Sequence, residues 1–136
     1  MLFRSYGQLY ADVPKWLREG WCDYLAPQLY WPIDQQPQAF AKLLRYWHEQ
    51  NTAGRAIWPG LYTSRIREGG RNVRGGELHD EIQLSRHAGQ GMPGHIHFSF
   101  KALRGDHALT ARQLRQRSYR DVASVPQLPW LQHRPR

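Results

Sequence analysis

Apolar side chains recur at helical spacing in one segment near the middle of the chain. In QAFAKLLRYWHEQN, residues 38–51, the side chains that share one helical face are Phe40, Leu43, Leu44 and Trp47. The opposite positions are mostly polar or charged. This pattern predicts an amphipathic helix that packs one face on a core and ends near Asn51.

Shorter helical patterns flank that segment. Residues 12–19 fit a short helix, because Asp12 can cap its first turn. ELHDEIQLSR, residues 77–86, is a further amphipathic pattern whose inward positions are Leu78, Ile82 and Ser85. A last helix is predicted over residues 110–117, before a proline-rich tail without a regular period.

Three segments between these helices have strand character. They are rich in aromatic and apolar residues and comprise DYLAPQLYW (Asp23–Trp31), AIWPGLYTSR (Ala56–Arg65) and HIHFSFKAL (His95–Leu103). A stretch rich in Gly and Arg, residues 66–76, follows the second strand and is predicted to be a long loop. Because strands and helices alternate, the order indicates βα units and an α/β fold.

Alternate residues divide each strand into an apolar and a hydrogen-bonding face. The apolar faces are Leu25, Pro27, Leu29 and Trp31, then Ile57, Pro59, Leu61 and Thr63, then Ile96, Phe98, Phe100 and Ala102. The opposite faces are Tyr24, Ala26, Gln28 and Tyr30, then Trp58, Gly60, Tyr62 and Ser64, then His95, His97, Ser99 and Lys101. An antiparallel sandwich would show this second face to water, whereas a barrel would turn it toward a ligand at its C-terminal rim.

Composition indicates one globular domain with a basic surface. The chain has 136 residues, 40% of them apolar, and a formal net charge of +8. Because the arginines are scattered, this charge favours a solvated surface over a nucleic-acid site. The single cysteine, Cys22, excludes an internal disulfide. We find no apolar run long enough for a signal-peptide core or a membrane-spanning helix.

Four segments resemble one known family. WLREGWCDYLAPQLYW (Trp16–Trp31) resembles a signature of the glycosyl-hydrolase-like family 10. WPGLYTSR (Trp58–Arg65) and GHIHFSFKAL (Gly94–Leu103) resemble, in the same order, the next two barrel strands of that family. VPQLPWL, residues 125–131, resembles its closing segment, so the resemblance covers nearly the whole chain.

The resemblance implies a partial TIM-like (β/α) barrel. Residues 1–136 would be the C-terminal fragment of the domain, with strands six to eight. A complete barrel needs about 250 residues, so strands one to five are expected upstream. The implied parent protein is a bacterial, usually exported glycoside hydrolase that acts on glycan chains, with cell-wall polysaccharide as one candidate. The loop at residues 66–76 departs from the family pattern, because it lacks the aromatic residue expected before the following helix.

The residues expected to contact a substrate lie near strand ends. Tyr30 and Tyr62 can stack on pyranose rings, and Gln28 can orient a sugar hydroxyl. Arg65 can bind an acidic substituent, with a surface ion pair as the alternative. Core packing is the favoured alternative for Trp31, because of the face on which it lies. The full predicted substrate-binding set is Gln28, Tyr30, Trp31, Tyr62, Ser64, Arg65, Ser99 and Lys101.

The pair of carboxyl groups that glycoside hydrolysis usually needs is not evident. Asp34 follows the first strand and is the one candidate on the expected catalytic rim, with a turn residue as the alternative. His95 and His97 have the spacing of metal ligands, but further ligands are missing from the pattern. We therefore expect no metal, no cofactor and no hydrolase activity in the isolated chain.

Two alternatives from other functional classes stay open. One is a carbohydrate-binding or structural remnant that never catalysed a reaction, and the other is a basic nucleic-acid-binding domain. In the barrel fragment that the resemblance implies, exposed strand edges and apolar surface are expected to favour self-association or partial disorder.

Overall fold

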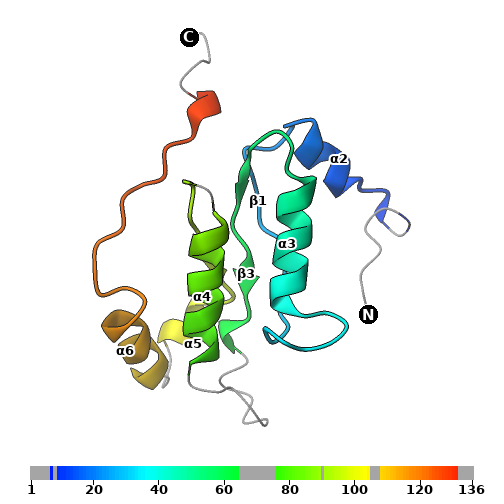
Figure 1. Cartoon of the computed structure of the whole chain (residues 1–136). Coiled ribbons are helices and arrows are strands. Elements are labelled where there is room, and N and C mark those ends of the chain that lie inside the picture. Colours follow the sequence, from blue (N-terminus) through cyan, green and yellow to red (C-terminus); the bar gives the residue numbers. More distant parts are fainter. Residues whose placement is uncertain (1–6, 8, 65–75, 90, 105–107, 132–136) are drawn as a thin grey trace.

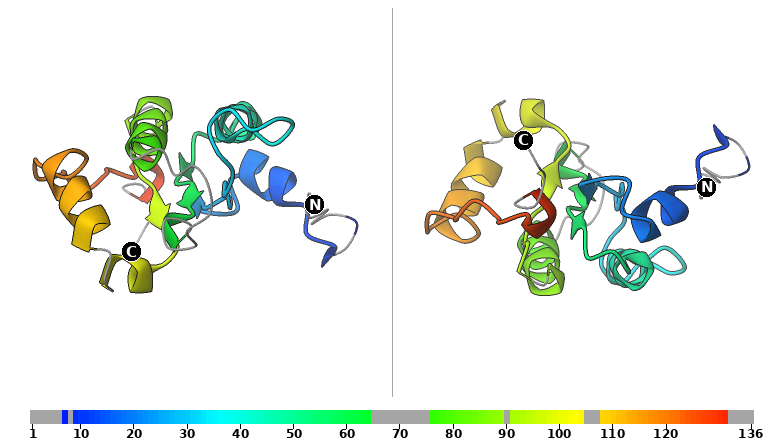
Figure 2. Two further views of the ribbon diagram at one scale, coloured as in Figure 1. Left: turned by 90° about the horizontal axis from the view of Figure 1, so that it is seen from below. Right: turned by 90° about the horizontal axis from the view of Figure 1, so that it is seen from above.

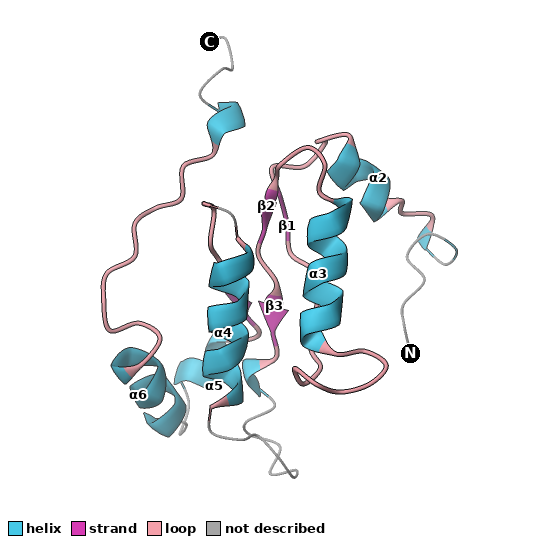
Figure 3. Ribbon diagram, in the orientation of Figure 1, coloured by secondary structure: helices cyan, strands magenta, loops and turns pink. Residues whose placement is uncertain are grey.

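A computed structural model describes residues 7, 9–64, 76–89, 91–104 and 108–131. In chain order, the elements are α2 (Val13–Arg18), β1 (Tyr24–Leu25), α3 (Phe40–Gln50), β2 (Ala56–Ile57), β3 (Gly60–Leu61), α4 (Glu77–Ala88), β4 (Ile96–His97), α5 (Phe100–Arg104), α6 (Ala108–Gln116) and the 3-10 turn η2 (Pro129–Leu131) (Figure 1). Helices cover much more of this part of the chain than the short strands do (Figure 3).

Apart from α5, the helices form where the apolar spacing or a capping residue predicts them. The Asp12 carboxylate accepts the Lys15 N–H at 3.1 Å and caps α2. Helix α3 buries Phe40 and Leu44, and α4 buries Ile82 and Ser85. The predicted last helix corresponds to α6. Among the described residues, no helix is long and apolar enough to cross a membrane.

Three extended segments lie side by side in chain order. Strand β1 pairs in parallel with β2, with Tyr24 opposite Ala56. Strand β3 pairs in parallel with β4, with Gly60 opposite Ile96. A parallel bridge between Gln28 and Gly60 connects the first segment with the second beyond β1. Parallel pairing follows physically from the helices α3 and α4, which return the chain to the same end of the sheet before each new strand.

One face of these segments is covered by helices. Helices α3 and α4 lie on the same side of the strands (Figure 2). The hydrophobic core comprises Leu17, Leu29, Phe40, Leu44, Ile57, Leu61, Ile82 and Leu114. Full burial of one such side chain stabilises the fold by about 1.5–3 kcal/mol. The opposite face carries Tyr24 at 49% exposure and Phe98 at 50% exposure.

The prediction of a third strand through Leu103 is wrong from residue 100 onward. Strand pairing there covers only Ile96–His97, and Phe100–Arg104 form helix α5. Lys101 therefore lies on a helix and not on a strand. The cause is that FKALR has good helix formers, while its alternation of apolar and polar residues is too short to specify a strand.

The faces assigned to the third strand are also wrong. His97 Nδ1 lies 2.6 Å from Oγ1 of Thr63, which is 1% exposed on the helix-covered side. Phe98 instead stacks with Tyr30 on the open side. The His97 imidazole thus hydrogen-bonds on the helix-covered side of the sheet, whereas the Phe98 ring packs with aromatic rings on the open side. The histidine face and the apolar face of HIHF, residues 95–98, each find partners in the fold. Alternation alone therefore does not show which of the two faces the helices cover.

The C-terminal tail returns to the end of the sheet where the strands begin (Figure 1). There the Trp130 indole N–H donates to the Asp23 carboxylate at 2.9 Å, across 107 positions of sequence. The Arg55 guanidinium lies over the Trp130 ring at 4.6 Å and donates to the Gly20 carbonyl at 2.9 Å. These contacts hold η2 against the segments that precede β1 and β2.

Candidate functional site

Three aromatic rings meet on the open face, where the strands end. The ring centroids of Tyr30 and Tyr62 are 5.1 Å apart, with an interplanar angle of 24°. The Phe98 ring lies 5.5 Å from Tyr30 and 6.1 Å from Tyr62. We call these three residues the aromatic cluster. They come from the three neighbouring parallel segments, so the sheet itself holds the rings together.

Both predicted serines, Ser64 and Ser99, lie beside the aromatic cluster. The Ser64 hydroxyl donates to the Phe98 carbonyl at 3.2 Å, and the Ser64 N–H donates to the same carbonyl at 3.1 Å. The Ser99 N–H donates to the Ser64 hydroxyl oxygen at 3.2 Å. The second and third segments are thus joined at their ends, next to the Phe98 ring.

The Tyr30 ring lies against the sheet beside Gly60. Gln28 forms a backbone bridge with Gly60, and a Cβ atom at Gly60 would lie 3.4 Å from a ring carbon of Tyr30. Such a distance is an ordinary van der Waals contact, so the Tyr30 ring packs directly over Gly60. The Gln28 side chain is exposed on the same open face. Gln28, Tyr30 and Tyr62 therefore lie on one surface, as their strand positions predict.

Burial affects the chemistry of one tyrosine in the aromatic cluster. Partial burial, and secondly the neighbouring Tyr62, raise the pKa of Tyr30 above its ordinary value of 10.0. The Tyr30 phenol is therefore protonated at neutral pH. It can donate a hydrogen bond to an acceptor such as a sugar hydroxyl oxygen.

Other predicted site residues lie elsewhere. Lys101 is exposed on α5, and Trp31 is partly buried in the turn after the first segment. Arg65 and almost all of the predicted loop 66–76 are outside the described residues. Asp34 is exposed and lines a separate hollow of about 370 Å³ together with Lys42 and Arg45 of α3.

Two residues that contribute to the region around the aromatic cluster were not identified from the sequence. Phe98 was assigned to the packing face, although its aromatic character was a usable signal for a sugar platform. Glu77, at the start of α4, accepts the Ile33 N–H at 3.1 Å through its carboxylate. This bond fixes the turn after the first segment against α4, and a local pattern gives no sign of a contact 44 positions away.

The two histidines of the H-x-H pattern share one hydrogen-bonding partner. Their Nε2 atoms both hydrogen-bond the Tyr119 hydroxyl, and that of His97 lies 2.6 Å from it. In the described part of the chain, no group of three or more His, Cys, Asp or Glu residues could hold a metal ion.

Comparison with named proteins identifies relatives of one kind. The chain is 31% identical to glycosyl hydrolase YngK of Bacillus subtilis (strain 168) over 137 residues, which cover 94% of this chain and 26% of that protein. It is 37% identical to glycosyl hydrolase DigH of Escherichia coli (strain K12) over 43 residues, or 32% of this chain and 10% of that protein. No family model and no solved structure matches. The chain spans about a quarter of the length of the first relative, and its sequence is glycosyl-hydrolase-like over nearly all of its own length.

Proposed function

We propose that this chain is the C-terminal part of a (β/α) barrel protein of the glycosyl-hydrolase-like family 10, and that it contributes a sugar-binding wall. The aromatic cluster is the observation that carries this proposal. It lies where three parallel segments end, and ligands of (β/α) barrels bind at that end of the strands. The relatives named as glycosyl hydrolases support a glycan as the ligand.

The cluster suits a pyranose ring in two ways. The exposed Phe98 ring offers an apolar surface for the C–H face of a sugar, with half of its area open to solvent. The protonated Tyr30 phenol and the exposed Gln28 amide supply hydrogen bonds for hydroxyl groups around that ring. A cell-wall polysaccharide in an exported parent protein is the substrate that we propose.

Glycan binding by the full 136-residue chain tests this function. We expect the chain to bind peptide-free glycan strands of peptidoglycan in calorimetry, without releasing reducing ends. Replacing Tyr62 with alanine removes a stacked ring and is expected to weaken binding about threefold to tenfold. The matched control is Tyr46→Ala, which removes an exposed tyrosine on α3 that stacks edge-on with Trp47.

The outcomes separate the proposal from its rivals. If Tyr62→Ala binds the glycan as tightly as the parent chain does, the aromatic cluster is not part of the binding site. Retention on DNA or RNA that falls steeply with salt, without glycan binding, would favour the nucleic-acid alternative. Release of reducing ends by the chain alone would show that the carboxylates are present after all.

Self-association through strand edges is a further part of the proposal. Within the described residues, β1 and β4 each pair with one neighbour, so each has an outer edge without a partner strand. We expect the sedimentation coefficient to rise with protein concentration. A constant monomer value over a wide concentration range would contradict this expectation.

A further inference from the structure

One residue of the second segment holds the backbone of the third segment where it leaves the sheet. The Ser64 hydroxyl donates to the Phe98 carbonyl oxygen at 3.2 Å and accepts the Ser99 N–H at 3.2 Å. The Ser64 N–H donates to the same carbonyl oxygen at 3.1 Å. Both polar groups of the peptide unit between Phe98 and Ser99 are therefore hydrogen-bonded to Ser64.

The chain changes from strand to helix at this peptide unit. Strand β4 ends at His97, and helix α5 begins at Phe100. The Ser99 carbonyl oxygen accepts the Ala102 N–H at 2.9 Å, so Ser99 already takes part in the start of the helix. Strand β4 has two residues and α5 has five, and elements of this length do not fix the chain by themselves. The bonds to Ser64 fix the backbone between them.

The Phe98 ring depends on this support. The residue is 50% exposed, and its described ring contacts are those with Tyr30 and Tyr62, at 5.5 and 6.1 Å between ring centroids. On its N-terminal side, the Phe98 N–H donates to the Leu61 carbonyl at 2.9 Å. On its C-terminal side, the backbone is hydrogen-bonded to Ser64. The direction of a half-exposed ring thus follows from these two backbone attachments.

The Ser64 hydroxyl has little capacity left for a ligand. A serine hydroxyl has one proton to donate and two lone pairs. In Ser64, the proton is donated to the Phe98 carbonyl, and one lone pair accepts the Ser99 N–H. A sugar hydroxyl could use only the remaining lone pair, whereas half of the neighbouring Phe98 residue is open to solvent.

We propose that Ser64 is a positioning residue, whose hydroxyl holds the Phe98 ring in the aromatic cluster where a sugar ring can stack on it. This role through Phe98 replaces the direct sugar contact that the sequence predicts for Ser64. The inference rests on the proposed function for the identity of the ligand. The position of the Phe98 ring, however, can be measured without any ligand.

Two substitutions of nearly the same shape isolate the hydroxyl. Ser64→Thr keeps it, whereas Ser64→Val replaces it with a methyl group. In NMR spectra of the full 136-residue chain without ligand, nuclear Overhauser effects between the Phe98 and Tyr30 ring protons report the contact of the two rings. We expect Ser64→Thr to retain these signals and Ser64→Val to lose about half of their intensity, because the lost hydrogen bond lets a second ring position compete. Melting curves of both variants identify any loss of folding.

Glycan binding shows whether the ring position matters for the ligand. With peptide-free glycan strands of peptidoglycan in calorimetry, Ser64→Val should bind about threefold more weakly than Ser64→Thr. The same pair is then compared in chains that also carry Phe98→Ala. There the difference should vanish, because no ring is left to be positioned. A direct sugar contact of Ser64 would instead keep the difference in the Phe98→Ala chains.

A control beside the aromatic cluster is Ser99→Ala. It removes a hydroxyl from the neighbouring serine but keeps the Ser99 N–H that donates to Ser64. The ring contacts of Phe98 should therefore be retained in this variant.

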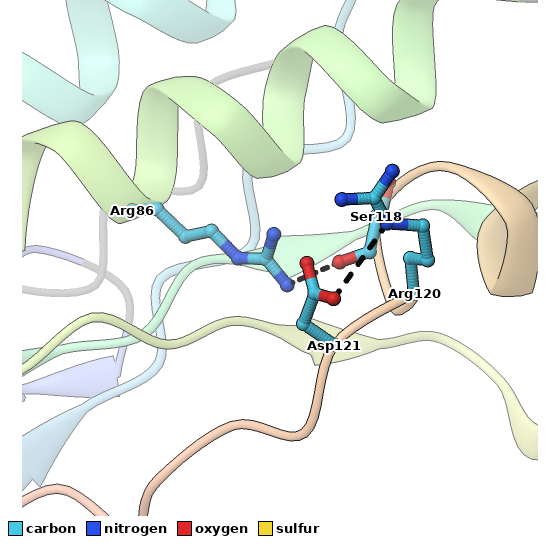
Figure 4. A network of polar contacts seen from close by, with 4 residues as sticks. All are labelled: Arg86, Ser118, Arg120 and Asp121. Atoms are coloured by element: carbon cyan, nitrogen blue, oxygen red, sulfur yellow. Dashed lines mark hydrogen bonds and ion pairs between the residues drawn. The ribbon is translucent and has the colours of Figure 1, made fainter.

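A control away from the aromatic cluster is Ser124→Ala, at an exposed position of the tail. It should leave both the ring contacts and the glycan binding unchanged. Ser118 is unsuitable for this purpose, because it is buried and its hydroxyl lies 2.9 Å from Nδ1 of His79. Its carbonyl also accepts a hydrogen bond from the Arg86 guanidinium, which joins the tail to α4 (Figure 4).

Equal ring contacts in Ser64→Thr and Ser64→Val would overturn the proposal, as would a difference in glycan binding that persists in the Phe98→Ala chains. Ring contacts that weaken in Ser99→Ala as much as in Ser64→Val would also overturn it, since the bonds to Ser64 are kept there. Failure of the parent chain to bind the glycan would contradict the proposed function instead, and the ring contacts would still decide the role of Ser64.

Discussion

Acidification should weaken the fold through His95, and the size of the effect follows from its surroundings. Burial, His97 and Arg86 lower the pKa of this imidazole from 6.5 to about 4 in the folded chain. The unfolded chain exposes the ring to water, where its pKa returns to its ordinary value. Between these two pKa values the unfolded chain binds more protons, so the free energy of unfolding falls as pH decreases.

The expected loss can be worked out from these two values. Each pKa unit corresponds to about 1.4 kcal/mol, so the complete effect is about 3 kcal/mol. Between about pH 7.5 and about pH 5, the contribution of His95 to this loss is about 2 kcal/mol. Burial also lowers the pKa values of His97 and His48, and these groups act in the same direction.

A comparison of variants isolates the share of His95. His95→Gln keeps a side-chain amide that can bond Tyr119, but it has no group that titrates in this range. Urea denaturation at both pH values gives the free energy of unfolding of each protein. The parent chain should lose about 2 kcal/mol more than His95→Gln does on acidification. His87→Gln, at an exposed position of α4, is the matched control.

An equal loss in the parent chain and in His95→Gln would refute the reasoning. It would mean that His95 is hydrated in the folded chain, and that the hydrogen bond to Tyr119 does not keep the ring neutral. A smaller loss in His87→Gln than in His95→Gln would also contradict the assignment.

Three further predictions concern stability and are read from urea denaturation. Ile82→Ala removes a side chain that is 0% exposed and should cost about 2–5 kcal/mol, whereas a cost below about 1 kcal/mol would deny its place in the core. Asp12→Ala removes the cap of α2 and should cost about 1 kcal/mol, while Asp12→Asn should recover most of it. Trp130→Phe removes the hydrogen bond to Asp23 and should lower the free energy of unfolding by about 1 kcal/mol. In a protein that already carries Asp23→Ala, the same substitution should cause no such loss.

The helices could be predicted because their determinants are local. The cap at Asp12 and the buried positions Phe40 and Leu44 lie within one or two turns of each other. The faces of the first two strands also follow from the sequence, since Leu29 and Leu61 are buried as their alternation indicates. A local pattern is enough where one face is apolar and the other is not.

The third strand could not be predicted in the same way. Its residues His97 and Phe98 both have partners, but these lie far away in the sequence, at Thr63, Tyr119 and Tyr30. Alternation shows that neighbouring residues face opposite sides, but not which side the helices cover. The aromatic cluster was therefore predicted in part, through Tyr30 and Tyr62, and its third ring was missed.

The contact between Trp130 and Asp23 has a consequence for the order of events during synthesis. Residues 23 and 130 are 107 positions apart. Residue 23 has therefore left the ribosomal exit tunnel long before residue 130 is added. Until then, the Asp23 carboxylate and the Arg55 guanidinium lack the indole that lies between them in the finished fold. The beginning of the sheet is thus completed only after residue 130 has been added.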